Sequence, residues 1–302
     1  MSLVATRDSE AIALLCSPVA VSDAKPLTQS EWAKLAATVH ASELERPGAL
    51  VGRSATELGE ALALDPEEAD RMAALLDRGG TLAFELERLE SRGIWLVTRA
   101  DASYPASLKR QLGLRAPALL FGAGAKAVPE HAVAVVGSRR ADTDALEFAA
   151  ELGRSLARDD VAVVSGGARG VDRGAMDGAL ETGNAIGVVA DSLVRLTQQA
   201  DLRAWLTESR LTLLTPYSPE ARFTVGNAMG RNRLVYCLAG HAVVVSTAAG
   251  SGGTWAGALE NLEAGWTPLW VWDSAAASDG NHELIARGGR PLSSPDAALL
   301  VS

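Results

Sequence analysis

Short apolar runs alternate with amphipathic stretches from residue 131 to residue 275. The runs, such as the valine-rich Ala132–Val136, are typical of strands buried on both faces of a parallel sheet. The stretches between them predict helices, and this alternation requires right-handed crossovers. We therefore predict an α/β fold with a doubly wound, mostly parallel sheet. The expected strands are 132–136, 161–165, 185–189, 211–214, 242–246 and 269–272, and the expected helices are 144–158, 171–181, 202–209, 231–238, 254–263 and 282–286.

The first 90 residues carry helical patterns separated by helix breakers. Asp65 and Pro66 offer a cap and a first-turn proline, which together form a strong helix start. After Gly93, two apolar runs predict strands at 94–98 and 118–122, with a short helix over 107–112 between them. The expected helices before residue 93 cover 30–40, 55–62, 69–77 and 81–92. We expect a small helical N-terminal module over 1–90, the α/β domain over 91–290 and a C-terminal tail over 291–302.

The composition is that of a globular protein, since 48% of the 302 residues are hydrophobic and 22% are charged. It excludes wholesale disorder, and no apolar stretch approaches the ~20 residues of a membrane-spanning helix. The N-terminus lacks a basic start followed by an apolar core, so we expect no secretory signal and a cytoplasmic location. Cys16 and Cys237 form no disulfide framework and cannot alone complete a zinc site.

The charge distribution limits how an anion could be bound. A net charge of −9 argues against a wholly basic nucleic-acid coat protein, while a local basic groove stays compatible with it. The only lysines in the sequence are Lys25, Lys34, Lys109 and Lys126. Any cationic site built from later residues must therefore consist of arginines.

Four glycine-bearing turns are expected at the carboxyl ends of the strands, where doubly wound sheets bind ligands. Glycine lets a ligand approach the backbone, the following helix offers free amides, and arginines in three of the turns supply partners for an anion. Taken singly, each turn is equally compatible with an ordinary strand-to-helix connection. Repeated along one edge, they indicate phosphate. The four segments are Val136–Arg140, Ser165–Asp172, Gly226–Arg233 and Ala249–Thr254.

None of these turns carries recognisable reaction machinery. The Gly-Lys-Ser/Thr of a P-loop and the glycine pattern of dinucleotide-binding folds are both missing from the sequence. The four histidines are scattered, and neither Ser138 nor Ser165 sits in a Gly-x-Ser-x-Gly elbow. We therefore expect an anion-binding edge without a catalytic residue, a metal or a cofactor. The residues expected to pack in the core instead are Cys237, Trp266, Trp270 and Trp272.

The order of these turns resembles the DprA/Smf family of bacterial DNA-processing proteins. The family pattern of strand, Gly-Ser-Arg, helix, strand and Ser-Gly-x-Ala-Arg-Gly-x-Asp is met by Val133–Arg139 and Ser165–Asp172. Its Arg-Asn-Arg helix start is met by Arg231–Arg233, and its Ser-Gly turn by Ser251 and Gly252. Upstream, an Asp-x-x-Tyr-Pro turn begins at residue 101, as in the family. The similarity covers roughly residues 80–290.

This resemblance implies an extended Rossmann-like domain that forms a homodimer and holds single-stranded DNA along its glycine-rich edge. It also implies that the protein protects this DNA and delivers it to a RecA-type recombinase during transformation or recombination, without enzymatic activity, metal or cofactor. The residues expected to bind nucleic acid or phosphate are Gly137, Ser138, Arg139, Arg140, Ser165, Gly166, Gly167, Arg169, Gly170, Asn227, Arg231, Asn232, Arg233, Ser251, Gly252, Gly253 and Thr254.

Some positions depart from the family pattern. An aromatic residue, available to stack on a base, usually stands three positions before Arg-Asn-Arg, and that position is Ala228 here. Met176 replaces the histidine that usually follows the second turn. An alternative is therefore a nucleotide-binding sensor of the DprA/LOG superfamily in a defence or stress system. N-glycosidic hydrolysis of the LOG type is disfavoured, because the LOG glutamate would fall on Gly257.

Overall fold

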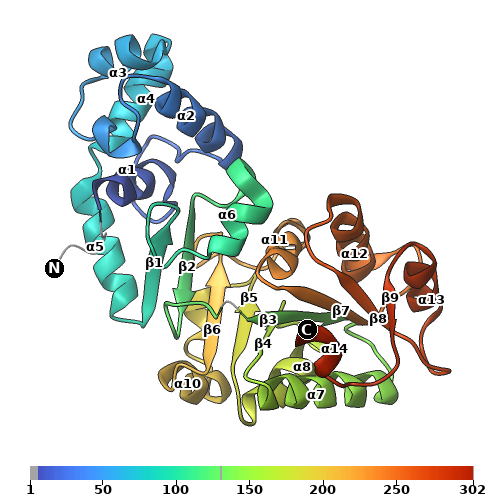
Figure 1. Cartoon of the computed structure of the whole chain (residues 1–302). Helices are drawn as coiled ribbons and strands as arrows, with labels where there is room; N and C mark the ends of the chain where they lie inside the picture. The colour runs from blue at the N-terminus through green and yellow to red at the C-terminus, as the bar shows by residue number, and fades with distance from the viewer. Residues whose placement is uncertain (1–5, 130, 302) are drawn as a thin grey trace. The chain divides into compact units, whose positions relative to one another are not determined.

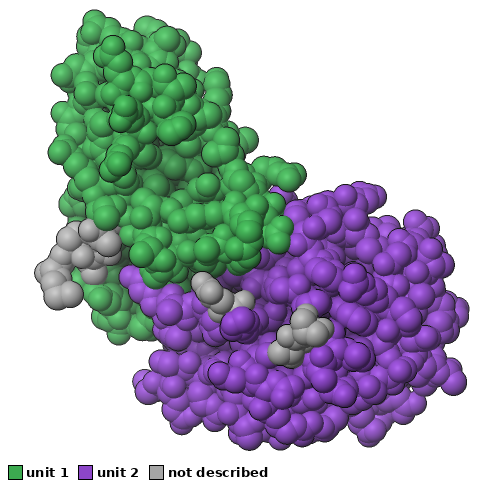
Figure 2. Space-filling view, viewed as in Figure 1, with its two compact units in different colours: residues 1–122, 216–219 green, residues 123–215, 220–302 purple. Residues whose placement is uncertain are grey.

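The computed structural model describes residues 6–129 and 131–301. The chain divides into two compact units, which Figure 2 shows in separate colours. Unit 1 comprises Met1–Gly122 and Pro216–Pro219, and unit 2 comprises Ala123–Thr215 and Glu220–Ser302. Unit 1 continues beyond its last long helix, which ends at Glu90, through two strands to Gly122. The predicted domain ranges 1–90, 91–290 and 291–302 stay a prediction.

The helices of unit 1 begin at side chains that satisfy their first backbone amides. Thr28 and Ser54 each accept a hydrogen bond from the backbone N–H three residues on, and Glu31 and Glu57 complete both capping boxes. Asp65 caps the next helix in the predicted way. The elements of unit 1, coloured blue to green in Figure 1, are α1 (Arg7–Cys16), α2 (Gln29–Ala41), η1 (Pro47–Leu50), α3 (Ala55–Leu62), α4 (Pro66–Leu76), α5 (Gly79–Glu90), β1 (Ile94–Thr98), α6 (Ala106–Leu112), η2 (Gly113–Arg115) and most of β2 (Leu119–Ala123).

Two buried polar groups fasten α1 to the rest of unit 1. Arg78 is only 6% exposed, and its guanidinium donates hydrogen bonds of 2.8–3.1 Å to three carbonyl oxygens at and beyond the end of α1. The carboxylate of Asp101 accepts hydrogen bonds from the hydroxyls of Ser9 (2.6 Å) and Thr98 (3.0 Å). Tyr104, in the same Asp-x-x-Tyr-Pro turn, is buried and donates to a backbone carbonyl oxygen at 2.8 Å. This turn therefore stabilises unit 1.

The strands of unit 2 form a parallel sheet in the order β6-β5-β4-β3-β7-β8-β9. The chain enters at β3 in the middle, adds β4 to β6 on one side and then β7 to β9 on the other. The strand order therefore reverses between β3 and β7, where Ala134 pairs with Ala242. Doubly wound folds bind ligands in the crevice outside the carboxyl ends of the strands at such a reversal. The strands are β3 (Ala132–Gly137), β4 (Ala162–Ser165), β5 (Ala185–Val188), β6 (Leu211–Thr215), β7 (His241–Ser246), β8 (Leu269–Trp272) and β9 (Arg290–Leu292).

Helices cover both faces of this sheet. Figure 1 shows α7 and α8 on one side of the strands and α11 and α12 on the opposite side. The strand interiors are apolar, so that Val135, Val163 and Val243 are each 0% exposed. The helices of unit 2 are α7 (Thr143–Arg158), α8 (Val171–Leu180), α9 (Leu193–Leu196), α10 (Ala200–Thr207), α11 (Val225–Cys237), α12 (Gly252–Ala264), α13 (Asp279–Ala286) and α14 (Ala298–Val301).

This arrangement confirms the predicted α/β class and its mostly parallel, doubly wound sheet. The predicted start of one helix is wrong: α11 begins at Val225 instead of Arg231, because Thr224 caps it and two glycines continue in helical geometry. The segment after residue 289 forms β9 and α14, where the sequence pattern indicated no element. Cys237, Trp266 and Trp272 are buried, as predicted, whereas Trp270, also predicted to pack in the core, is half-buried. No helix in the described part of the chain is long and apolar enough to cross a membrane.

Candidate functional site

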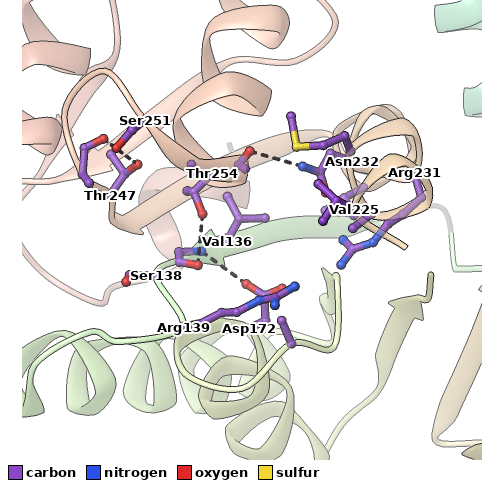
Figure 3. A pocket seen from close by; sticks show the side chains of 18 of the residues that line it. Val136, Ser138, Arg139, Asp172, Val225, Arg231, Asn232, Thr247, Ser251 and Thr254 are labelled. Atoms are coloured by element: carbon purple, nitrogen blue, oxygen red, sulfur yellow. Dashed lines mark hydrogen bonds between the residues drawn. The ribbon is translucent and has the colours of Figure 1, made fainter. Parts of the chain in front are cut away.

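A cavity of about 470 Å³, here called the first cavity, lies where the strand order reverses between β3 and β7 (Figure 3). All four segments singled out in the sequence contribute to its wall. The structure thus brings together distant segments, as in the hydrogen bond from the Thr254 hydroxyl to the Gly137 carbonyl oxygen, 117 positions apart. The predicted site residues that line the first cavity are Gly137, Ser138, Arg139, Arg140, Arg231, Asn232, Ser251, Gly252, Gly253 and Thr254.

The β3–α7 turn places two exposed arginines at the first cavity. Ser138 donates its backbone N–H to the carbonyl oxygen of Ser246 at 2.8 Å, and its hydroxyl accepts a hydrogen bond from the Arg140 N–H at 3.1 Å. The Arg139 guanidinium lies 5.4 Å from the ring centroid of Phe223, within the range of a cation–π contact. The turn therefore presents positive charge beside an aromatic ring.

The residues of the β4–α8 turn differ in exposure and in the contacts they make within the protein. Ser165 is 0% exposed and donates its hydroxyl to the carbonyl oxygen of Val135 at 2.6 Å, so it joins β4 to β3 and lines neither the first cavity nor the one described below. Gly170 has a φ of +91°, and a methyl group there would overlap the Ser138 carbonyl oxygen. This glycine therefore allows the first and second turns to pack together. Arg169, in contrast, is exposed.

Arg231, predicted as a phosphate ligand, forms part of the cavity wall. The residue is 6% exposed, and its guanidinium donates a hydrogen bond to the Gly166 carbonyl oxygen at 3.0 Å. A methyl group on Gly166 would overlap that guanidinium, so glycine at this position makes room for the arginine. The nearby Asp172 carboxylate accepts a hydrogen bond from the Gly137 N–H at 3.3 Å. Burial raises the pKa of Asp172, and the charge of Arg231 opposes this rise. The Arg231 guanidinium is therefore engaged by the protein itself, through the Gly166 carbonyl oxygen and the neighbouring Asp172.

The segment predicted as the third turn is the first half of α11. Thr224 accepts a hydrogen bond from the Asn227 N–H, which caps the helix. The Asn232 side chain lies at the first cavity and donates to the Gly253 carbonyl oxygen at 3.2 Å, which joins α11 to the fourth turn (Figure 3). Asn227 does not line this cavity, and neither does Arg233, whose Nε donates to a carbonyl oxygen of its own helix.

The β7–α12 turn is fixed at both ends. Asn281 of α13, 0% exposed, accepts a hydrogen bond from the Thr247 N–H at 3.1 Å and donates at 2.9 Å to one carbonyl oxygen of β7 and one of β8. At the other end, the Thr254 hydroxyl donates to the Gly137 carbonyl oxygen at 3.0 Å. Ser251 and the first two residues of α12, Gly252 and Gly253, therefore lie at the first cavity in restrained geometry.

A second cavity, of about 510 Å³, adjoins the first. It lies beyond the carboxyl ends of β4 and β5 and is also lined by residues of α8, α9 and α10. The two cavities share Arg139, Ala168, Phe223 and Arg231. Three further predicted site residues line the second cavity alone: Gly166, Gly167 and Arg169.

Apart from the buried Arg231, the arginines around the two cavities fall into two groups. Arg173 and Arg195 form ion pairs with aspartates of unit 2. Three others are exposed and make no ion pair with a carboxylate of residues 6–129 or 131–301. We call these three the exposed arginine group: Arg139, Arg140 and Arg169.

Two aromatic side chains outside the predicted set line the first cavity. Phe223 is 45% exposed and directly precedes the Thr224 cap of α11. Tyr236 is 2% exposed, and burial raises its pKa. The sequence signal for Phe223 is its position before a helix start at the ligand edge. The location of Tyr236 at this cavity could be expected only once α11 is known to begin at Val225.

The chemistry that this edge offers is that of binding. Within the described residues, no group of three or more His, Cys, Asp or Glu side chains is arranged to hold a metal ion. The cavities present guanidinium groups, backbone amides and apolar side chains. Such a combination suits an anion that is attached to an apolar or planar group.

Comparison with known proteins assigns the chain to a family. A model of the family described as DNA recombination-mediator protein A matches residues 95–300. A curated DNA processing protein DprA from Mycobacterium tuberculosis (strain ATCC 25618 / H37Rv) is 35% identical over 233 residues, which cover 71% of this chain. The chain spans 59% of the length of that relative.

Solved structures agree with this fold. DNA processing protein A from Streptococcus pneumoniae superimposes with a TM-score of 0.73 at 20% identity, over 99% of both chains. DNA processing protein A from Helicobacter pylori gives a TM-score of 0.55 at 24% identity, over 66% of this chain and 92% of that chain. At these identities, the likeness shows the fold. Because the family model covers more than half of its residues, the chain belongs to the DNA recombination-mediator protein A (DprA) family.

Proposed function

We propose that this protein binds single-stranded DNA along the carboxyl edge of the unit 2 sheet. The observation that carries the proposal is the exposed arginine group, whose three guanidiniums stand at two adjoining cavities without carboxylate partners among the described residues. Guanidinium groups beside helix N-termini suit phosphate oxygens. The exposed Phe223 adds an aromatic surface of the kind that bases stack on.

The relative from Helicobacter pylori supports this choice of ligand, because its structure addresses a single-stranded DNA binding mode of that protein. In our proposal, phosphates contact the exposed arginine group and the amides of the turns. Of the predicted residues, those proposed to contact DNA are Gly137, Ser138, Arg139, Arg140, Gly167, Arg169, Asn232, Ser251, Gly252, Gly253 and Thr254.

A salt titration tests the proposed ligand. Fluorescence anisotropy with a labelled strand of roughly 20 nucleotides measures the affinity at each salt concentration. Each neutralised phosphate of a single strand contributes about −0.7 to the slope of log K against log salt, so three arginines give about −2 per chain. A slope near zero would contradict phosphate binding at this edge.

Substitution of one arginine locates the contact. Arg169→Ala should weaken binding and make the slope shallower by about 0.7, because one phosphate contact is lost. Arg195→Ala removes the same charge from an arginine that is already paired with Asp191, and serves as the matched control. Equal effects of the two substitutions would point to net charge instead of a defined contact.

A nucleotide-binding sensor is the second candidate. It is favoured by the size of the first cavity, about 470 Å³, which lies in the range that holds one small ligand. Competition of the labelled strand with mononucleotides separates the two functions. Displacement by micromolar mononucleotide favours the sensor, and resistance to it favours the DNA strand.

We propose further that the protein acts in the cytoplasm as a homodimer without a chemical step, and that it protects the bound strand and passes it to a RecA-type recombinase. Two aligned edges on one strand would multiply the effective concentration of each. Light scattering of the full chain tests the dimer, and a monomer at micromolar concentration would contradict it. Faster formation of RecA filaments on strands carrying this protein tests the transfer, and an unchanged rate would contradict it.

A further inference from the structure

The second cavity has an inner wall that phosphate binding does not use. Met176, Leu180, Val189 and Leu213 are each at most 5% exposed and form apolar parts of that wall. A phosphodiester gains nothing from such a surface, whereas a nucleobase is a planar ring with apolar faces. The volume of about 510 Å³ lies within the range of small-molecule sites.

The boundary between the two cavities is suited to both parts of a nucleotide. Arg139 and Phe223 line both cavities, with the guanidinium 5.4 Å from the ring centroid. The phenylalanine is 45% exposed, so part of its surface is open to a ligand. An aromatic ring next to a cation that can hold phosphate is placed to stack on the base of the same nucleotide.

One polar side chain at the second cavity is available to a base edge. The side-chain amide of Gln199 makes no hydrogen bond to another side chain or backbone group that the structure describes. An amide both donates and accepts, which matches the mixed donors and acceptors of a base. The nearby carboxylates of Asp177 and Asp191 are occupied by ion pairs with arginines, so their charge is offset.

We infer that the second cavity is a nucleobase subsite, and that one nucleotide spans both cavities. Its phosphate lies at Arg139 and Arg169, and its base enters the second cavity against Phe223. This inference rests on the proposed function and adds the base to it. The required chemistry is that of a nucleotide, either within a strand or free.

Two labelled probes test the subsite: an oligothymidylate of roughly 20 nucleotides and an abasic strand of the same length. The unsubstituted protein should bind the thymidylate about tenfold more tightly, because only that strand can fill the second cavity. Leu196 is half-buried, lines the second cavity and does not line the first. Leu196→Trp should fill the cavity and reduce thymidylate affinity to that of the abasic strand. Unchanged binding of the abasic strand shows that the variant is folded.

Further variants separate the subsite from general effects. Phe223→Ala should produce the same selective loss by removing the stacking surface instead of filling the cavity. Leu146→Trp is the matched control, because Leu146 is a 36% exposed leucine on α7 that lines neither cavity. It should leave the affinity for both probes unchanged.

The outcomes distinguish this inference from the proposed function. Equal affinity of the unsubstituted protein for both probes would overturn the base subsite and leave phosphate binding intact. Binding to neither probe would overturn both proposals. Equal losses on both probes in Leu196→Trp would also overturn the subsite. Competition by thymidine monophosphate identifies the source of the base. If the monophosphate displaces the labelled strand from the unsubstituted protein but not from Leu196→Trp, the subsite takes a free nucleotide. If Leu196→Trp loses affinity for the thymidylate strand and the monophosphate never competes, the subsite takes a base of DNA.

Discussion

Arg231 donates a hydrogen bond to the carbonyl oxygen of Gly166 at 3.0 Å, which joins α11 to the turn after β4. The arginine lines both cavities, yet its side chain is almost fully buried. Its charge also stabilises the ionised form of the buried Asp172 carboxyl group. Arg231 therefore holds the wall between the two cavities in place.

Replacement of Arg231 should destabilise unit 2. Arg231→Ala leaves the Asp172 carboxylate buried without its neighbouring cation, a change that typically costs about 3–5 kcal/mol of unfolding free energy. Urea unfolding measures the loss. The double variant Arg231→Met with Asp172→Asn should recover a large part of it, because no charge is then left buried.

The stability of the Arg231→Ala variant should also depend more strongly on pH than that of the unsubstituted protein. Since burial raises the pKa of Asp172 above its unfolded value, the folded state binds this proton more tightly, and stability falls as pH rises through the folded pKa. Loss of Arg231 raises that pKa further. The destabilisation should therefore be larger at a pH well above the ordinary carboxyl pKa than at a pH below it. An identical loss at both values would show that Asp172 is not the cause.

Ala228→Phe tests whether a base passes through the first cavity. Ala228 is half-buried and lines this cavity, so a larger side chain there meets any ligand. Stacking on an aromatic ring is worth about 1–3 kcal/mol per base, so binding of an oligonucleotide should tighten by roughly tenfold or more. The salt slope should stay unchanged, because no phosphate contact is altered. Weaker binding of a mononucleotide, without a gain for the strand, would favour the sensor.

Asn281→Ala should weaken ligand binding from a position outside both cavities. The substitution leaves two buried carbonyl oxygens and the Thr247 N–H without this partner. The Thr247 N–H keeps the Ser278 hydroxyl as an acceptor at 3.3 Å. Each of the two carbonyl oxygens that loses its donor costs about 1–3 kcal/mol, so the loss should reach about 2–6 kcal/mol in total. The loop 247–253 should loosen, and strand affinity should fall. His282→Ala, on the same helix at an exposed position, is the control and should change neither property.

Glu31→Gln should lower the stability of unit 1 at neutral pH and leave it unchanged at strongly acidic pH. Hydrogen bonds from Arg71 and from the Thr28 backbone lower the pKa of Glu31 to about 2. Its contribution to stability is therefore present above the ordinary pKa of 4.5 and is lost as pH falls toward 2. Because the side chain is 40% exposed, the loss at neutral pH should be no more than about 1 kcal/mol. Glu57→Gln removes a capping-box glutamate whose hydrogen bonds, within the described residues, come from Ser54 and not from an arginine, and it should have the smaller effect in thermal unfolding.

The sheet was predictable from sequence because strands buried on both faces are continuously apolar. The strand 269–272 was located to the residue, and the other predicted strands of unit 2 to within one residue at either end. The short β9 was not predictable, since Arg290 and Pro291 are exposed and interrupt the apolar pattern. Its identity as a strand depends on pairing with β8.

The ligand edge was predictable because glycine and arginine recur after successive strands. Which of those residues face a cavity and which stabilise the fold was not predictable. A sequence cannot show that Ser165 bonds across to β3, or that Gly166 makes room for Arg231. Both facts depend on side chains from distant segments that meet in the fold. The start of α11 was mistaken because Gly226 and Gly230 resemble turn residues, while the Thr224 cap decided the helix.

No lysine among the described residues lines either cavity, and Lys126 is the last lysine along the sequence. Acetylation acts on lysine, whereas guanidinium groups keep their charge at any pH at which proteins fold. Acetylating enzymes and amine-reactive dyes would therefore modify lysines elsewhere and leave the cationic edge as it is. A fluorophore attached through lysine can thus report on ligand binding without chemically altering the exposed arginine group.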